Sequence, residues 1–167
     1  VSEEFMRKVE KDDTYHTINP HGNTPVKKLR AREIFNKIVE NAWDSGEPGI
    51  IFLDRINADN PTPHIGRIES TNPCGEQPLL PYEACNLGSI NLSRFVVDGK
   101  VDFERLRKVV RTAVHFLDNV VDMSEFPIEK IKEMVRANRK IGLGIMGWAD
   151  MLIKLRIPYN SEEAIQK

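Results

Sequence analysis

The chain contains only two cysteines, Cys74 and Cys85. That number and their wide separation exclude a disulfide-stabilised scaffold and a zinc ribbon, which need several cysteines in close pairs. An excess of one charge is also missing, because 24 basic and 25 acidic residues leave a net charge of −1. The sequence therefore offers no electrostatic basis for binding nucleic acid or an anionic membrane surface.

Long apolar runs are absent as well. No stretch approaches the roughly 20 apolar residues that a membrane-spanning helix needs, and no signal-peptide pattern opens the chain. With 167 residues, 40% hydrophobic and 29% charged, the composition is that of a soluble globular protein able to bury a real core. We therefore expect a cytoplasmic protein that engages neither nucleic acid nor membrane.

The two ends of the chain predict an internal segment of a longer protein. Residue 1 is Val1, not an initiator Met, and a helical pattern begins at Ser161 just before the chain ends. Ser161 suits an N-cap because acidic residues follow it in the first turn. We expect residues 1–167 to be an internal segment of a larger domain, truncated at both ends.

Apolar periodicity in the first part of the chain predicts helices mixed with strands. Residues 1–30 read as a short amphipathic helix followed by an irregular lead-in or β-ribbon. A strong helical stripe over 31–43 leads into the apolar run 50–54, which is typical of a strand buried on both faces. Residues 31–54 are therefore predicted to form a helix–strand unit of an α/β protein.

Residues 83–167 are predicted to continue as strands and helices. The expected elements are a strand over 83–92, a hairpin turn at Asp98-Gly99, helices over 103–123, 129–140 and 149–155, and a buried small-residue strand over 141–148. Among the histidines, His16 and His21 are predicted to be surface residues because neither has a partner at metal-ligand spacing. His115 is predicted to pack beside the core stripe of its helix.

Three glycines, Gly142, Gly144 and Gly147, satisfy the pattern G-x-G-x-x-G. In a dinucleotide-binding protein a strand precedes the first glycine, whereas here a basic helical pattern ends at Lys140. We therefore favour close packing of a strand against a helix over a cofactor site.

The stretch 69–78 gathers more chemistry than any other part of the chain. Asn72, Cys74 and Glu76 supply an amide, a thiol and a carboxylate at alternate positions, which would share one face of an extended backbone. Pro73 restricts the backbone, and Gly75 allows a ligand to approach it closely. The pattern suits a rigid loop that presents reactive groups, although a plain connector with a buried cysteine is the structural alternative.

Several separate blocks extend this motif over nearly the whole chain. They are Asn72–Leu80 and Tyr82–Leu92, with Ala42–Gly49 before them and Arg139–Gly147 and Ile157–Ala164 after them. Together these blocks resemble the catalytic core of ribonucleotide reductases, and the Asn-Pro-Cys-Gly-Glu form resembles the class II, adenosylcobalamin-dependent enzymes in particular. The resemblance implies an α/β fold that forms part of a ten-stranded α/β barrel, with 69–78 as its central finger loop.

The resemblance also implies roles for the loop residues. Cys74 would become a thiyl radical that removes the 3′ hydrogen of a ribonucleotide substrate. Glu76 would act as general base at the 3′-OH, within hydrogen-bond reach of the proton it takes. Asn72 would hydrogen-bond and orient the ribose, and Pro73 and Gly75 would complete the substrate-binding loop.

Cys85 would be one of two thiols that deliver the reducing equivalents and end as a redox-active disulfide, its partner lying outside this chain. The resemblance further implies adenosylcobalamin bound outside this segment, nucleotide effectors, a thioredoxin-like reductant, the rest of the catalytic subunit, and a homodimer at full length. No metal ligands are expected within the chain.

Two alternatives stay open. One is a class I catalytic subunit that takes its radical from a separate subunit, and the other is a noncatalytic interaction domain descended from the same family. The intact set Asn72, Cys74, Glu76 and Cys85 favours an enzyme, although the segment alone is expected to be inactive. The choice between diphosphate and triphosphate substrates is also left open.

Overall fold

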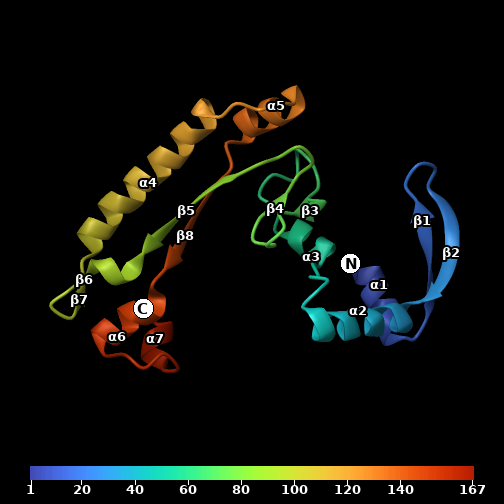
Figure 1. The fold of residues 1–167 in the computed structure, drawn as a ribbon, viewed down its shortest axis with the longest axis horizontal. Coiled ribbons are helices and arrows are strands. Elements are labelled where there is room, and N and C mark those ends of the chain that lie inside the picture. Colours follow the sequence, from blue (N-terminus) through green and yellow to red (C-terminus); the bar gives the residue numbers. More distant parts are fainter. The chain divides into compact units, whose positions relative to one another are not determined.

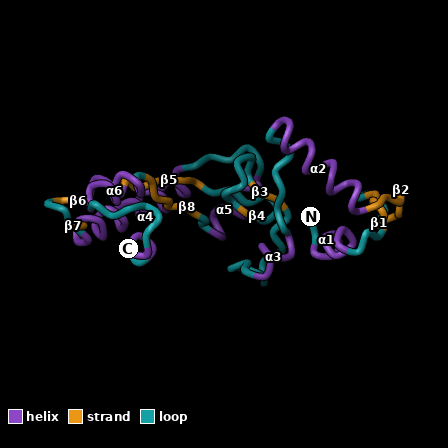
Figure 2. Tube along the Cα trace, turned by 90° about the horizontal axis from the view of Figure 1, so that it is seen from below, coloured by secondary structure: helices purple, strands orange, loops and turns teal.

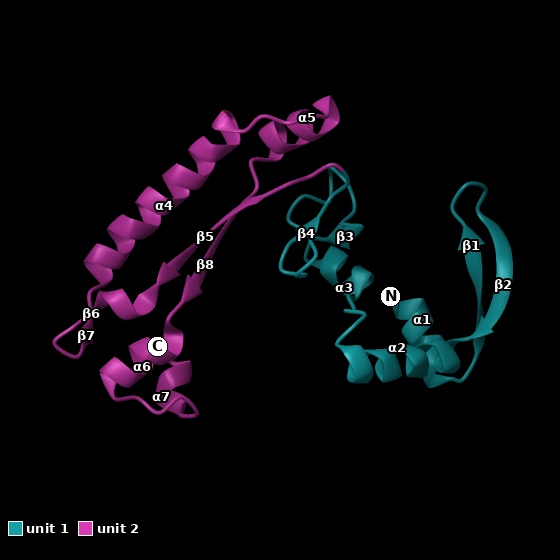
Figure 3. Ribbon diagram, viewed as in Figure 1, with its two compact units in different colours: residues 1–81 teal, residues 82–167 magenta.

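The computed structural model describes residues 1–167, and these divide into two compact units, Val1–Pro81 and Tyr82–Lys167 (Figure 3). Helices and strands are mixed in both units (Figures 1 and 2), and the strands form four two-stranded sheets. The predicted α/β character is therefore confirmed, without a closed barrel within this chain. No helix is both long enough and apolar enough to cross a membrane.

The first unit begins with two helices and a hairpin, as the sequence predicts. The elements are α1 (Glu3–Glu10), β1 (Thr14–Asn19), β2 (Thr24–Arg30) and α2 (Ala31–Ser45). The Ser2 hydroxyl caps α1 by accepting a hydrogen bond from the Phe5 N–H at 3.1 Å. Val9 and Ala31 are buried where α1 packs against α2. Gly46 ends α2 in the left-handed conformation with φ of 83°, which glycine adopts without steric cost.

The strand predicted over residues 50–54 is wrong. The backbone is irregular up to Phe52 and then forms the short helix α3 (Leu53–Ala58). The Asn57 side chain donates to the Leu53 carbonyl at 2.9 Å and makes two hydrogen bonds of 2.8 Å with the backbone of Ile68. Ile50 and Phe52 are 40% and 42% exposed, because no other strand of this unit lies beside them to bury the run.

A minimal hairpin follows α3 and holds the predicted loop. Its strands β3 (Ser70–Thr71) and β4 (Pro78–Leu79) pair antiparallel, with Ser70 opposite Leu79 and Thr71 opposite Pro78. Ile68 and Leu80, which flank the hairpin, are buried at 5% and 3% exposure. The hairpin is therefore anchored at its base by apolar packing.

The second unit is built on a pair of parallel strands, β5 (Asn86–Asn91) and β8 (Ile141–Met146). The long helix α4 (Phe103–Met123) packs along this pair (Figure 1). The remaining elements are the 3₁₀ turn η1 (Leu92–Phe95), the hairpin β6 (Val96–Val97) and β7 (Lys100–Val101), and the helices α5 (Glu129–Asn138), α6 (Trp148–Leu155) and α7 (Glu162–Ile165). The core of the unit consists of Ile90, Leu92, Phe95 and Met151, with a second cluster of Leu152, Ile157 and Ala164.

Most sequence predictions for the second unit are confirmed. Helix α4 has the predicted bounds, and its stripe buries Leu117 and Val121. Asp98 and Gly99 have φ of 49° and 71°, the two positive values that a tight hairpin turn requires. Helix α5 ends at Asn138, earlier than predicted, because Arg139 takes a left-handed conformation with φ of 47°.

Two details of burial differ from the predictions. Strand β8 forms, but it is not buried in this chain, since Ile145 and Met146 are 64% and 55% exposed. His16 and His21 are exposed as predicted, whereas His115 is also exposed and does not pack into the core. Helical geometry explains the error, because His115 is rotated by about 200° from the buried Leu117 on α4.

Candidate active site

The loop that carries the predicted reactive residues is a tight turn, not an extended strand. The Gly75 N–H donates to the Asn72 carbonyl at 3.0 Å, which closes a four-residue β-turn. Pro73 occupies the second position of this turn, where its fixed φ is favourable. The premise that alternate residues share one face of a strand is therefore wrong for this loop, and the turn itself presents Cys74 at its tip.

Hydrogen bonds at its base hold the loop in this shape. The Asn72 N–H donates to the Gln77 carbonyl at 3.3 Å, and the Gln77 N–H donates to the Asn72 side-chain oxygen Oδ1 at 3.0 Å. The Thr71 hydroxyl donates to the Asn72 carbonyl at 2.9 Å. Asn72 thus shapes the loop through its side chain as well as its backbone.

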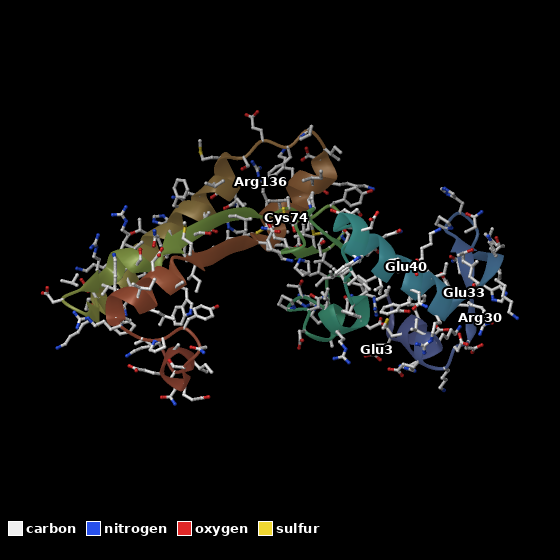
Figure 4. All side chains as sticks on the ribbon, turned by 60° about the horizontal axis from the view of Figure 1, so that its bottom comes forward. Glu3, Arg30, Glu33, Glu40, Cys74 and Arg136 are labelled. Atoms are coloured by element: carbon white, nitrogen blue, oxygen red, sulfur yellow. The ribbon has the colours of Figure 1, made fainter.

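The tip of the loop is open to solvent. Cys74 is a free, exposed thiol (labelled in Figure 4), and Gly75 and Glu76 are exposed beside it. Gly75 has φ of 85°, and a Cβ atom added there would meet no atom within 4 Å. The loop therefore presents a thiol and a carboxylate on a constrained backbone with room for a ligand.

Cys85 belongs to the second unit and immediately precedes β5. Its thiol is free and half-buried, and it donates to the Asn86 carbonyl at 3.4 Å. Burial raises the pKa of the Cys85 thiol, the Lys140 ammonium opposes that rise, and the Glu83 carboxylate adds to it. The thiol is therefore protonated to a larger extent at neutral pH than an exposed cysteine.

Sequence reasoning missed the polar cluster beside Cys85. The Glu83 side chain is fully buried and accepts hydrogen bonds from Asn138 Nδ2 at 2.8 Å and Lys140 Nζ at 2.6 Å. Its partners lie 55 and 57 residues away in the chain, so no local pattern reveals the contact. The first unit holds a second overlooked group, since the Gln77 side-chain nitrogen Nε2 is buried at the base of the loop without a hydrogen-bond partner.

No cluster of three or more His, Cys, Asp or Glu side chains is arranged to hold a metal ion. The loop carries the amide of Asn72, the thiol of Cys74 and the carboxylate of Glu76. A sequence profile described as "Ribonucleotide reductase, barrel domain" matches residues 1–167. The chain belongs to the ribonucleotide reductase family.

Named ribonucleotide reductases match along the whole segment. A "Vitamin B12-dependent ribonucleoside-diphosphate reductase" of Thermoplasma acidophilum is 58% identical over 167 residues, which is 99% of this chain and 22% of that protein. A protein of the same name from Mycobacterium tuberculosis is 52% identical over 166 residues, or 99% of this chain and 24% of its own length.

A more distant match is the "Ribonucleoside-diphosphate reductase subunit alpha" of Chlamydia muridarum. It is 38% identical over 144 residues, which cover 84% of this chain and 14% of that protein. The ribonucleotide reductase segment described here thus spans less than a quarter of the length of these relatives.

Proposed function

We propose that this chain is the finger-loop segment of a catalytic subunit that reduces ribonucleotides to 2′-deoxyribonucleotides for DNA synthesis. The observation that carries the proposal is the exposed Cys74 thiol at the tip of a hydrogen-bonded turn, with the Glu76 carboxylate two residues further on. The strong similarity to proteins named ribonucleoside-diphosphate reductases supports the reaction and favours diphosphate substrates.

The proposed setting is a ten-stranded α/β barrel to which this chain contributes part of the wall and the finger loop at 69–78. Parallel strands occur almost only in sheets covered on both faces, yet β5 and β8 form an isolated parallel pair here. Leu87 and Ile145 on these strands are 53% and 64% exposed. These features support further strands and covering elements in the full-length protein.

The loop residues have distinct tasks in the proposed reaction. A thiyl radical at Cys74 removes the 3′ hydrogen of the ribose, and the Glu76 carboxylate takes the proton of the 3′-OH. The bond between C2′ and oxygen breaks, the oxygen leaves as water, and a hydrogen replaces it at C2′. Two thiols, one of them Cys85, lose two electrons and two protons and form a disulfide, which balances the reduction. The 3′ hydrogen then returns from Cys74.

Asn72 is proposed to orient the ribose, with Pro73 and Gly75 completing the loop around it. The Asn72 Oδ1 atom accepts the Gln77 N–H in this structure, so its Nδ2 group is the part assigned to the substrate. A side chain that both closes the loop and contacts the ribose would fix the position of Cys74 relative to the substrate.

Adenosylcobalamin is the proposed radical source, because the relatives above 50% identity are named vitamin B12-dependent. When bound, this cofactor supplies the radical chemistry that amino-acid side chains lack. The proposed binding site for this cofactor lies outside the segment. What the chain contributes is Cys74, whose exposure at an open loop tip suits a hydrogen-atom acceptor.

Further partners are proposed for the full-length protein. They are the rest of the catalytic subunit, a second copy in a homodimer, nucleotide effectors bound outside this segment, and a thioredoxin-like dithiol reductant. The free thiols Cys74 and Cys85 suit the reducing cytoplasm, where cysteines are kept reduced.

The proposal is tested in the full-length protein with a ribonucleoside diphosphate, adenosylcobalamin and a dithiol. Cys74→Ser is expected to abolish deoxynucleotide formation, because serine cannot hold the radical. Cys85→Ser is expected to block multiple turnovers with the dithiol, because one of the two reducing thiols is lost.

Ser70→Ala is the matched control, since Ser70 is exposed on β3 at the base of the same loop, and it should retain activity. Appreciable product from Cys74→Ser would refute the radical assignment, and undiminished turnover of Cys85→Ser would refute its role as a reducing thiol. Product that requires a separate radical-generating subunit, and no cobalamin, would support the class I alternative.

A further inference from the structure

A buried ion pair anchors the segment that leads into Cys85. Glu83 is completely buried, and its two carboxylate oxygens accept from Asn138 Nδ2 at 2.8 Å and from Lys140 Nζ at 2.6 Å. Tyr82, the residue before Glu83, is also held: the Lys130 ammonium lies 5.3 Å from the centre of its ring. The approach to β5 is thus tied to both ends of α5 and to the residue that precedes β8.

The strand register brings this pair next to the thiol. Asn86 lies opposite Ile141 in the parallel β5–β8 pair. Stepping back by one residue on each strand places Cys85 beside Lys140. The thiol therefore lies at the head of the β5–β8 pair, with a cation across from it and the carboxylate partner of that cation two residues before it in the chain.

We propose that Glu83 and Lys140 are positioning residues for Cys85, which hold its thiol at the head of the β5–β8 pair and control its reactivity in thiol–disulfide exchange. This inference rests on the proposed function, in which Cys85 is one of the two reducing thiols. Neither residue contacts the reacting ribose in this scheme, since both act through Cys85.

Electrostatics explains why an ion pair suits this position better than an apolar contact. A buried ion pair adds little net stability over a hydrophobic replacement of similar volume, so stability alone is a weak reason for it. Its charges do act on the neighbouring thiol: burial raises the pKa of Cys85, Lys140 lowers it, and Glu83 partly cancels the effect of Lys140.

The rate of thiol–disulfide exchange at Cys85 depends on the charges beside its thiol. To regenerate the enzyme, a thiolate of the dithiol reductant attacks the sulfur bonded to Cys85, a new S–S bond forms, and the old one breaks. Cys85 leaves as a thiolate with the electron pair and then takes a proton from solvent. The second thiol of the reductant resolves the mixed disulfide. A leaving thiol departs faster when its pKa is lower, so the Lys140 ammonium accelerates this step.

The test measures alkylation of Cys85 by iodoacetamide at pH 7 in the reduced full-length protein. Cys74→Ser is present in every sample, because trypsin releases both cysteines on one peptide, residues 68–94. Glu83→Gln leaves Lys140 unpaired and keeps an acceptor for Asn138, so alkylation should become roughly threefold faster. Lys140→Met removes the cation, and alkylation should slow by a similar factor.

The two variants are expected to change the alkylation rate of Cys85 in opposite directions, and this distinguishes an electrostatic effect on the thiol from a purely structural role. Loss of local structure would expose Cys85 and accelerate alkylation in both variants, which would overturn the proposal, as would unchanged rates. If Lys140→Met alone does not fold because the buried Glu83 carboxylate has lost its cation, the double variant removes both charges. Adding Lys140→Met to Glu83→Gln must then slow alkylation, and any other result overturns the proposal.

Glu129→Gln is the control, because Glu129 forms an exposed ion pair with Lys132 on α5 and should leave the alkylation rate unchanged. The alkylation rate is measured without turnover, so it tests the positioning role of Glu83 and Lys140 separately from the proposed role of Cys85 as a reducing thiol. Unaltered alkylation combined with a turnover block in Cys85→Ser refutes only the inference about Glu83 and Lys140. Sustained turnover of Cys85→Ser refutes the proposed function of that thiol.

Discussion

Replacing Gly147 with alanine is expected to destabilise the junction between β8 and α6 strongly. Gly147 has φ of 71°, and a Cβ atom added there would lie 2.2 Å from the Asn91 side-chain oxygen and 3.4 Å from the Ser93 nitrogen. That Asn91 oxygen accepts hydrogen bonds from the Ser93 N–H at 3.1 Å and the Ser93 hydroxyl at 2.8 Å. The new methyl group must therefore displace Asn91 and break both bonds.

The magnitude follows from two costs. Holding alanine in the left-handed conformation costs about 1–2 kcal/mol. Ser93 is buried at 7% exposure, so the loss of its two acceptor contacts adds about 2–3 kcal/mol. The expected total is about 3–5 kcal/mol. Gly99 is the matched control, because it has the same φ of 71° but open space around its Cβ position. Gly99→Ala should cost only the conformational term, about 1–2 kcal/mol.

Amide hydrogen–deuterium exchange in the full-length protein measures these local free energies. In peptides covering 91–95 and 147–155, Gly147→Ala should accelerate exchange by about 100-fold or more, since each 1.4 kcal/mol corresponds to tenfold. Gly99→Ala should affect mainly the β6–β7 hairpin, and by about tenfold.

A double-mutant cycle with Asn91→Ala isolates the steric part of the prediction. Once Asn91 is truncated, the additional cost of Gly147→Ala should fall to that of Gly99→Ala. Equal effects of the two glycine substitutions, or simple additivity of Gly147→Ala and Asn91→Ala, would refute the reasoning.

Further predictions concern the packing and charges of the second unit. Leu152→Ala should destabilise it by about 2–5 kcal/mol, because Leu152 is 1% exposed and its truncation leaves a cavity. Its neighbour Ile153, 72% exposed, should change stability by less than about 0.5 kcal/mol when replaced by alanine, as judged by thermal unfolding. Hydrogen bonds from Arg139 hold the pKa of Asp118 and of Asp122 below its usual range. The two ionised aspartates therefore stabilise the folded protein above about pH 4, the pKa of an unfolded aspartate. This stabilisation is lost as the pH falls through the lowered pKa values that the two groups have in the folded protein. The difference in melting temperature between the parent protein and Arg139→Met should accordingly be steady from pH 7 to 5 and shrink below pH 4, and a constant difference would contradict the assignment.

Local patterns predicted the elements whose signals are self-contained. The apolar stripe of α4 runs through Phe103–Met123 without interruption, and the helix has those bounds. Asp98 and Gly99 predicted their turn because few other residues tolerate positive φ at both positions. Ser161 caps a helix by accepting a backbone N–H, as its position before acidic residues predicts, and Ser2 caps α1 in the same way.

Short apolar runs and side-chain directions were less predictable. The run at 50–54 has the composition of a buried strand, but such runs cannot be assigned by periodicity alone. In the helix that forms there, the Asn57 side chain bonds to Ile68, eleven residues away, a contact that no local pattern reveals. For Asn72, Cys74 and Glu76, residue types and spacing predicted a rigid reactive loop, whereas the β-turn geometry came from the bond between Gly75 and Asn72.

The sequence by itself determined the family of this chain, the position of its two cysteines, and the helices with a continuous apolar stripe. These depend on residue identity and on contacts within a few positions. Only the tertiary structure showed that Asn72 closes its own loop through its side chain and that Glu83 is buried against Asn138 and Lys140. Such contacts join residues far apart in the chain or depend on one side-chain rotamer, and no local periodicity encodes either.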